Sequence, residues 1–305
     1  MIVYLILAAT LLFSLWSLVI LWNTRTKPLS GCWLKLLLAT GSASVMYLYG
    51  AWVFLSVYGR YVFAACFLLL FIFSLVHKKS ATQVNRIRNS SNIVSGLFAV
   101  AFWLLIILYF TGTAGKPYGV ADLALPFKRG TYFVFQGGEG LPTNIFHYGG
   151  RRTLYAMDII KLNSAGNRAK HIFSDRLEDY EIFNDTIYSP CAGVIARTES
   201  TNPDNVPPAR KRGPTNLNMV LIETSSEWVF LGHLKQGGVF VKKGAIVIPG
   251  QPLGLAGNSG ASLEPHLHIQ AHAKTSRDAP WYQQPQLLMK FDGRSYLLFE
   301  EIPVR

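Results

Sequence analysis

The segment PHLHIQAH, residues 265–272, carries histidines at alternating positions. On a β-strand, alternate side chains lie on one face, so His266, His268 and His272 would share a face. A strand rises about 3.3 Å per residue, which places His266 and His268 about 6.6 Å apart. Two imidazoles at that separation can both reach one metal ion, or one can bind the metal while the other contacts its water. His272 would lie about 13 Å from His268, so we interpret it as structural or as a neighbour of the site.

Three further residues can contribute to such a site. Asp158 lies in the apolar stretch YAMDII, where a buried carboxylate is costly unless it pairs with a cation or binds a metal; a structural ion pair is the alternative. His233 ends the apolar run FLGHL, and His147 lies in TNIFHYGG. His171 has no supporting context. The sequence contains no HExxH motif and no CxxC pair, so neither a helix-borne glutamate mechanism nor a cysteine-held metal is expected.

Two other motifs carry weaker hypotheses. The stretch GNSGA, residues 257–261, is faintly similar to a serine nucleophile elbow, but no helical pattern follows it. We interpret Asn258 and the adjacent glycines as the turn before the histidine strand. The stretch VKKGAIVIPGQ is similar to the hairpin of biotinyl or lipoyl carrier domains. There, however, the acceptor lysine occupies the hairpin tip, whereas Lys242 and Lys243 precede the glycine.

From Thr131 onward, short β-type runs alternate with Gly, Pro and Asn. This pattern predicts a mostly antiparallel β domain, a sandwich or a related fold. Helical periodicity is limited to short turns near 174–182 and 283–290. The stretch 199–216 is predicted to be an exposed loop, either the rim of a groove or a solvated hairpin insertion. The expected strands are 131–136, 154–160, 187–197, 218–224, 227–233, 245–248, 252–256 and 265–272.

The first third of the chain is strongly apolar. A bilayer core of about 30 Å is crossed by about 20 apolar helical residues, and each run is near that length. A cleaved signal peptide is disfavoured for the first run, which lacks a basic leading region and is too long. We therefore expect an α-helical transmembrane region of four spans at 1–112, a linker at 113–130 and a β domain at 131–305. The apolar runs are roughly 2–22, 33–57, 61–77 and 92–112.

Charge is divided unequally along the chain. All 17 acidic residues lie at or after Asp122, and from Lys116 onward 21 basic residues face those 17, a surplus of 4 out of the total of +12. Nucleic acid is therefore not an expected partner. The basic loops at Lys78–Arg88 and around Arg25 favour the cytoplasmic side. Four spans then place both termini outside, and we expect a multi-pass protein of the cell (inner) membrane, surrounded by lipid, with its β domain in the periplasm or outside the cell.

The run VKKGAIVIPGQPLGLAGNSGASLEPHLHIQ resembles the signature of the lysostaphin-type (M23, LytM-like) zinc metalloendopeptidases. The segments NDTIYSPCAGVIA, NMVLIET and FLGHL resemble the same family, in the same order, so the resemblance covers roughly residues 131–285. It implies a compact antiparallel β fold with a groove over one zinc ion (Zn2+) per chain. It also implies hydrolysis of peptide bonds, in peptidoglycan peptides or another extracytoplasmic peptide.

The resemblance also implies roles for single residues. Asp158 and His268 correspond to metal ligands. His266 and His233 correspond to the catalytic pair, in which His266 takes the proton of the attacking water and His233 hydrogen-bonds the developing oxyanion.

The remaining metal ligand departs from the family's common spacing. A histidine four residues before the aspartate is usual, but Leu154 occupies that position here. The nearest upstream histidine is His147, and a branch of the family with a longer loop before YA-x-D resembles this arrangement. His147 is therefore the expected third ligand. The loss at Leu154 also supports an alternative hypothesis, a non-catalytic module that binds zinc or wall peptides and regulates another protein, although the otherwise complete site argues against it.

Overall fold

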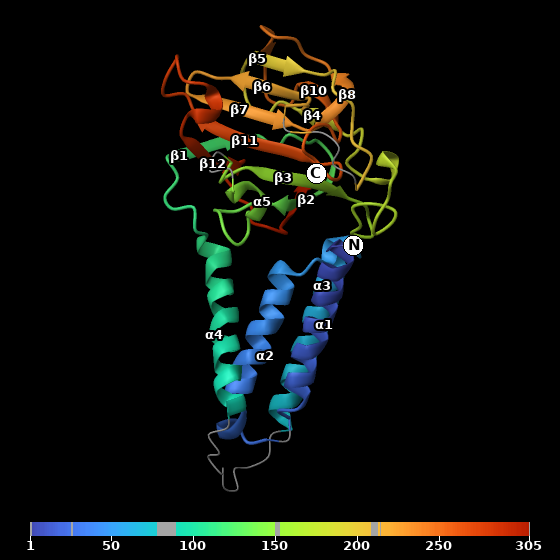
Figure 1. The fold of residues 1–305 in the computed structure, drawn as a ribbon, viewed down its shortest axis with the longest axis vertical. Helices are drawn as coiled ribbons and strands as arrows, with labels where there is room; N and C mark the ends of the chain where they lie inside the picture. The colour runs from blue at the N-terminus through green and yellow to red at the C-terminus, as the bar shows by residue number, and fades with distance from the viewer. Residues whose placement is uncertain are drawn as a thin grey trace. The chain divides into compact units, whose positions relative to one another are not determined.

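The computed structural model describes residues 2–25, 27–77, 90–149, 153–208, 213 and 215–304. It contains two compact units, Met1–Thr111 and Gly112–Arg305 (Figure 1). The first holds four long apolar helices and the second a mostly antiparallel β domain, so the predicted fold class is confirmed. The basic loop from Lys78 to Arg88, on which the expected orientation partly depends, lies outside the described residues.

Most strands of the second unit belong to one large sheet. Among the described residues it has ten strands, in the order β13-β2-β3-β11-β7-β6-β5-β9, with β12 on β11 and β1 on β12. Strands β4, β10 and β8 form a second, three-stranded sheet. All pairings are antiparallel except that of β1 with β12. The strands are β1 Gly119–Leu123, β2 Gly130–Gln136, β3 Met157–Leu162, β4 Thr186–Tyr188, β5 Gly193–Glu199, β6 Met219–Glu223, β7 Glu227–Gly232, β8 Leu234–Val239, β9 Ile246–Val247, β10 Pro252–Ala256, β11 Leu267–Ala273, β12 Gln286–Phe291 and β13 Glu301–Val304.

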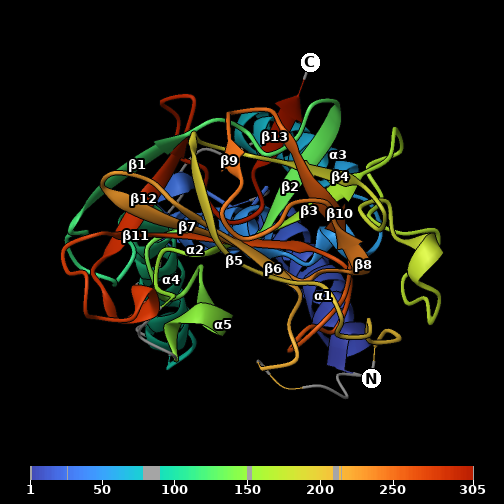
Figure 2. The same ribbon diagram turned by 90° about the horizontal axis from the view of Figure 1, so that it is seen from above.

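Strand β11 lies inside the large sheet, between other strands (Figure 2). Along one edge it pairs with β7, and along the other edge it pairs with β3 at residues 267–269 and with β12 at residues 271–272. Leu267, Ile269 and Ala271 point into the main hydrophobic core, where each is at most 2% exposed. The intervening positions, His268 and Gln270 among them, therefore lie on the opposite face. One strand thus supplies core packing with one set of side chains and polar chemistry with the other.

Three local expectations differ from the structure. The run 187–197 is not one strand, because β4 and β5 belong to different sheets and a turn through Pro190 separates them. The stretch 283–290, expected to be a helical turn, forms a 3₁₀ turn at Trp281–Gln283 and then β12. Tertiary pairing with β11 overrides the weak local helical pattern there. Within 113–130, expected to be a linker, residues 119–123 form β1 beside β12.

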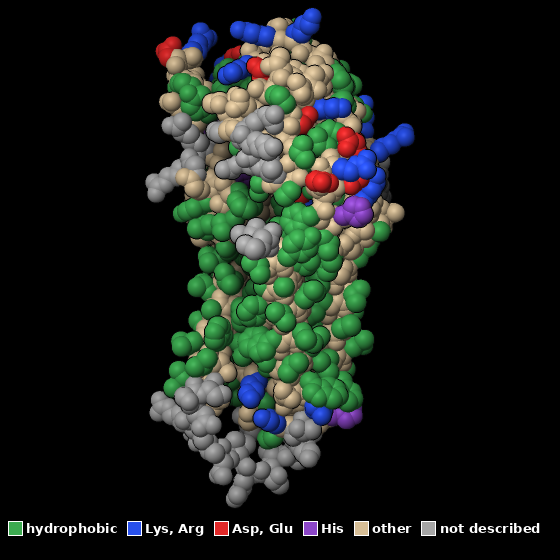
Figure 3. All heavy atoms as spheres, turned by 45° about the vertical axis from the view of Figure 1, so that its right-hand side comes forward, with side chains coloured by type: hydrophobic (Ala, Val, Ile, Leu, Met, Phe, Trp, Pro, Cys, Tyr) green, Lys and Arg blue, Asp and Glu red, His purple; other side chains and the backbone are tan. Residues whose placement is uncertain are grey.

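The helices of the first unit are α1 Ile2–Trp22, α2 Leu29–Tyr49, α3 Tyr58–Val76 and α4 Ser90–Thr111, with a 3₁₀ turn, Trp52–Phe54, between α2 and α3. The expected run 33–57 is helical only to Tyr49, because Gly50 adopts an extended conformation. Each helix has a segment of 19 or 20 residues that is long and apolar enough to cross a membrane. Large apolar side chains cover the visible face of this unit (Figure 3).

Candidate metal centre

Two candidate ligands meet because of strand register. In the antiparallel pairing of β3 with β11, His268 lies directly opposite Asp158. Directly opposed residues point to the same face of a sheet. Accordingly, Nδ1 of His268 lies 2.9 Å from Oδ1 of Asp158. The β ladder alone therefore brings these two side chains together.

His147 reaches the same place from a loop. It lies in the short helix α5, Ile145–Tyr148, within the connection between β2 and β3. Its Nε2 is 3.3 Å from Oδ1 of Asp158. Asn144 folds the connection back on itself, because its Nδ2 donates to the carbonyl oxygens of Leu154 (3.0 Å) and Ala156 (2.9 Å). This fold-back explains how a histidine with the unusual spacing still arrives beside the aspartate.

The hydrogen bonds of Asn144 also define which nitrogen of His147 carries its proton. Since both short contacts of Asn144 Nδ2 go to carbonyl oxygens, its Oδ1 is the acceptor of the 2.7 Å bond from Nδ1–H of His147. With Nδ1 bonded to Asn144, Nε2 of His147 is the ring nitrogen that faces Asp158 and can bind a metal. His268 contacts Oδ1 of Asp158 through Nδ1 (2.9 Å) and Oε1 of Gln270 through Nε2 (3.1 Å), so its Nδ1 can bind a metal when the proton of the ring lies on Nε2.

The result is a buried group of electron-pair donors. Ligand atoms of His147, Asp158 and His268 all lie within 4.8 Å of one another. Among the described residues, Asp158 forms ion-pair contacts with three histidines, His147, His266 and His268, and it is only 7% exposed. Burial would raise the pKa of Asp158, but His147 and His266 outweigh burial and hold it well below its usual range. Two imidazole nitrogens that face an ionised, buried carboxylate at short distance fit a metal ion.

A second pair of imidazoles lies beside this group. The ring centres of His233 and His266 are 4.5 Å apart. Nδ1–H of His233 donates to the carbonyl of Ser259 (2.7 Å), and Nδ1–H of His266 donates to the carbonyl of Glu264 (2.8 Å). His233 has a left-handed backbone, with φ of 60°, at the junction of β7 and β8. This bend interrupts the strand and permits the ring to turn toward the groove.

The pKa values of the two rings are shifted in opposite directions. Burial lowers the pKa of His233 well below its ordinary value, so its Nε2 carries a lone pair and accepts hydrogen bonds. Burial also opposes protonation of His266, but Asp158, 3.5 Å from its Nε2, outweighs burial and raises its pKa. His233 can therefore hydrogen-bond an oxyanion, as expected from the sequence, only after it has gained a proton.

All five expected site residues line one groove of about 480 Å³. Phe146 and Thr153 line it near His147, and residues 261–264 form a wall before His266. His272 lies outside the groove: its Nδ1–H donates to the carbonyl of Gln284 (2.8 Å). Ser259 Oγ donates to the carbonyl of Leu234 (2.7 Å) instead of facing the groove as a nucleophile.

Sequence patterns did not identify several supporting residues. Asn144 precedes His147 by three positions, and this helical spacing was a local clue to their contact. Ser259 supports His233 from 26 positions away. Arg168 contacts Glu264, in the groove wall, across 96 positions. Contacts over such distances have no local sequence pattern.

Residues 179–280 match the sequence model of Peptidase family M23. No curated protein sequence matches the chain. Solved structures with a similar fold include a zinc-containing peptidase from Vibrio cholerae, 18% identical over 52% of this chain and 41% of that chain, with a TM-score of 0.29. The catalytic domain of the antimicrobial peptidase lysostaphin from Staphylococcus simulans is 16% identical over 52% of this chain and 87% of that chain, with a TM-score of 0.28.

A third structure is the catalytic domain of a prophage-encoded M23 protein from Enterococcus faecalis, which is 15% identical over 57% of this chain and 95% of that chain, with a TM-score of 0.29. This chain spans about two fifths of the Vibrio cholerae protein. TM-scores this low transfer no residue role or substrate. The family match covers β4 to β11 and includes the histidine strand, so residues 179–280 of the β unit are similar to peptidase family M23.

Proposed function

We propose that this chain is a membrane-anchored, zinc-dependent endopeptidase that hydrolyses peptide bonds in peptidoglycan peptides. One observation carries the proposal. His147 Nε2, Asp158 Oδ1 and His268 Nδ1 converge in a groove that also receives the imidazoles of His233 and His266. A ligand group beside two proton-transfer groups is what hydrolysis requires, whereas metal binding alone would not need the second pair.

The donor set suits zinc. Two imidazole nitrogens and one carboxylate oxygen are ordinary zinc ligands, and three protein ligands leave a fourth position open, as in catalytic sites. Zinc held in this way supplies a nucleophilic water at neutral pH and polarises a carbonyl group. The structure supports one ion per chain, because this is the group of such ligands found among the described residues.

The protein's own contribution is to move protons and to orient the peptide. His266 and His233 both hold Nδ1–H on a backbone carbonyl, so each offers Nε2 for proton transfer. We propose that His266 accepts the proton of the attacking water. His233 begins neutral, and the proton that His266 has taken from the water can pass to it and from there to the leaving nitrogen. With ring centres 4.5 Å apart, the pair can serve both ends of the reaction.

The four apolar helices support membrane anchoring, and the basic residues of their loops support an outward-facing β unit. Such a domain would meet cell-wall peptides in the periplasm or outside the cell.

The test uses the full chain in detergent, loaded with one equivalent of zinc and incubated with purified peptidoglycan. Mass spectrometry should detect fragments with new amino termini. Asp158→Asn and His268→Ala should release none, whereas His171→Ala, outside the groove, should match the wild type. Tight zinc binding without cleavage would support the alternative of a non-catalytic module. Cleavage that survives both chelation and His268→Ala would refute the proposal.

A further inference from the structure

A buried ion pair joins the groove wall to the connection between β3 and β4. Nε of Arg168 donates to Oε1 of Glu264 (2.9 Å) and its Nη2 donates to Oε2 (2.8 Å). The two side chains are only 2% and 12% exposed. A two-point contact between a guanidinium and a carboxylate fixes both position and angle, which a single contact does not.

Arg168 is itself firmly placed. Its Nη2 also donates to the carbonyl of Ile172 (3.0 Å), and its guanidinium lies 5.8 Å from the ring centre of Tyr180. Its own carbonyl accepts the N–H of Glu181 (2.9 Å), next to a β-bridge between Ala169 and Tyr180. The connection between β3 and β4 is thus folded around the guanidinium.

Glu264 connects Arg168 to His266. Its side chain holds Arg168, while its backbone carbonyl accepts Nδ1–H of His266 (2.8 Å). Ser262 Oγ donates to the same carbonyl (2.9 Å). Displacement of Glu264 would therefore move the acceptor that determines where Nε2 of His266 points.

We propose that Arg168, through Glu264, is a positioning residue for His266, and that the connection between β3 and β4 acts as a brace for the groove wall. This inference rests on the proposed function for its effect on rate. The brace also pairs the carboxylate of Glu264, which lines the same groove as Asp158, with a cation. The hydrogen bonds of Arg168 reach Glu264, whose carbonyl holds His266, so the loss of Arg168 should alter proton transfer more than metal binding.

The kinetic test compares variants of the full chain on purified peptidoglycan. Arg168→Met should lower the maximal rate by up to ~100-fold, the order of loss for a catalytic group displaced by about 1 Å. Half-saturating peptidoglycan concentration and zinc affinity should stay near wild type. Arg168→Lys, which restores one of the two contacts, should recover part of the rate.

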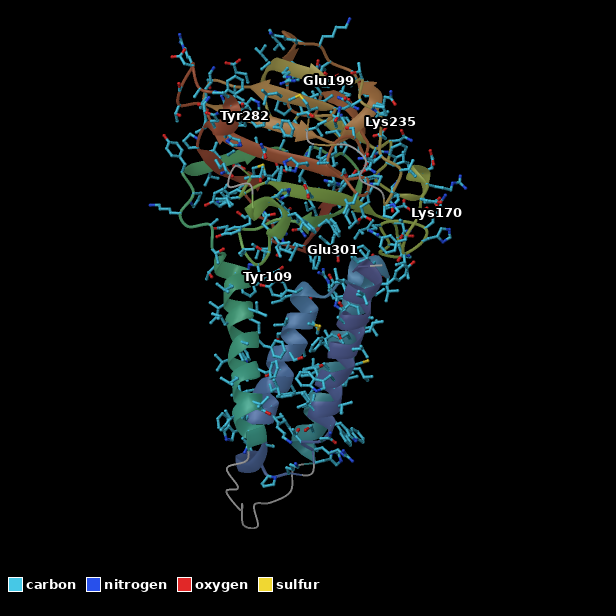
Figure 4. The ribbon with its side chains drawn as sticks, in the orientation of Figure 1. Tyr109, Lys170, Glu199, Lys235, Tyr282 and Glu301 are labelled. Carbon is cyan, nitrogen blue, oxygen red and sulfur yellow. The ribbon has the colours of Figure 1, made fainter. Side chains whose placement is uncertain are left out.

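Lys170→Met is the matched control. Lys170 belongs to the same connection and pairs with Asp179 (3.3 Å), but its side chain is 63% exposed and points away from the sheets (Figure 4). It should leave the rate unchanged. Equal losses in Lys170→Met and Arg168→Met, no recovery in Arg168→Lys, or a parallel loss of zinc affinity would each show a merely structural role and overturn the inference.

A second measurement does not depend on activity. In histidine-¹⁵N-labelled, zinc-loaded chain in micelles, Nδ1–H of His266 should give an exchange-protected NMR signal. Arg168→Met should lose that protection and Lys170→Met should keep it. If the wild type cleaves nothing yet shows this pattern, the proposed function fails while the brace stands. If Arg168→Met keeps the protected signal, the brace is wrong whatever the activity.

Discussion

The three candidate ligands are held in two different ways. Asp158 and His268 are opposed residues of neighbouring strands, and the backbone ladder of β3 and β11 places them. His147 is on a loop, where hydrogen bonds of the Asn144 side chain position it. A sheet register places a pair of ligands without additional residues, whereas a loop-borne ligand needs its own supporting hydrogen bonds.

The largest effect is expected at the sheet pair. Asp158→Asn removes the negative charge that faces His147, His266 and His268. We expect zinc binding and hydrolysis to fall below detection, because no other carboxylate belongs to the described ligand group. Competition with a chromogenic chelator would measure the loss. Near-normal affinity in this variant would mean that the ion binds elsewhere.

A smaller loss is expected at the loop ligand. His147→Ala leaves Asp158 and His268 in register, so a two-residue site should remain with weakened zinc affinity. The same chelator competition, with the melting temperature as a check on folding, would rank it against Asp158→Asn. If His147→Ala binds zinc as tightly as the wild type, His147 is not a ligand.

Substitutions of Asn144 should lower zinc affinity less than His147→Ala does. Residues that orient a ligand typically contribute about 10- to 100-fold in metal affinity. Asn144→Leu removes the acceptor for His147 and both donors to the loop, while Asn144→Asp keeps an acceptor and loses the donors to Leu154 and Ala156. Zinc affinity should fall in both, and more in the leucine variant. Wild-type affinity in the aspartate variant would show that the fold-back needs no donor at this position.

The smallest effect is expected at His272, which the sheet places on the face of His268 but outside the groove. His272→Gln should leave zinc affinity unchanged. Burial lowers the pKa of His272 in the native state. As the pH falls below about 6.5, the unfolded chain therefore binds a proton at this residue while the native chain does not. Native stability is therefore full above that pH and declines as pH falls toward the native pKa. Melting temperatures at pH 7.5 and 5.5 should differ less in His272→Gln than in wild type.

Local patterns predicted strands best where apolar runs end in turn residues. The expected strands 131–136, 218–224 and 252–256 correspond closely to β2, β6 and β10. Strand β8, LKQGGV, has two glycines and little apolar alternation, so no pattern indicated it. Strands β1 and β13 were also missed, because short segments acquire strand structure from partners far along the chain. The four apolar helices needed no such partners to be recognised, since lipid-crossing length is a property of the sequence alone.

The site shows the same division. The spacing of His266 and His268 indicated a shared face before any fold was known. The apolar surroundings of Asp158 and His233 marked these two residues as candidates, and the family resemblance gave them roles. The fold-back at Asn144 and the contact of Arg168 with Glu264 depend on side-chain hydrogen bonds that form only in the folded chain. Their residue types are ordinary, so neither composition nor spacing distinguishes them from surface residues.

Because β11 alternates core residues with histidines, this domain should tolerate insertions and deletions in β11 poorly. Core residues and histidines occupy alternate positions of this strand. A slip of one residue would therefore turn His268 and His272 into the hydrophobic core and move Leu267, Ile269 and Ala271 out of it. A misaligned strand would therefore be too unstable to persist. A chain that has completed its hydrophobic core has therefore already aligned its candidate ligands. One-residue insertions or deletions in β11 should disrupt the core and the site together.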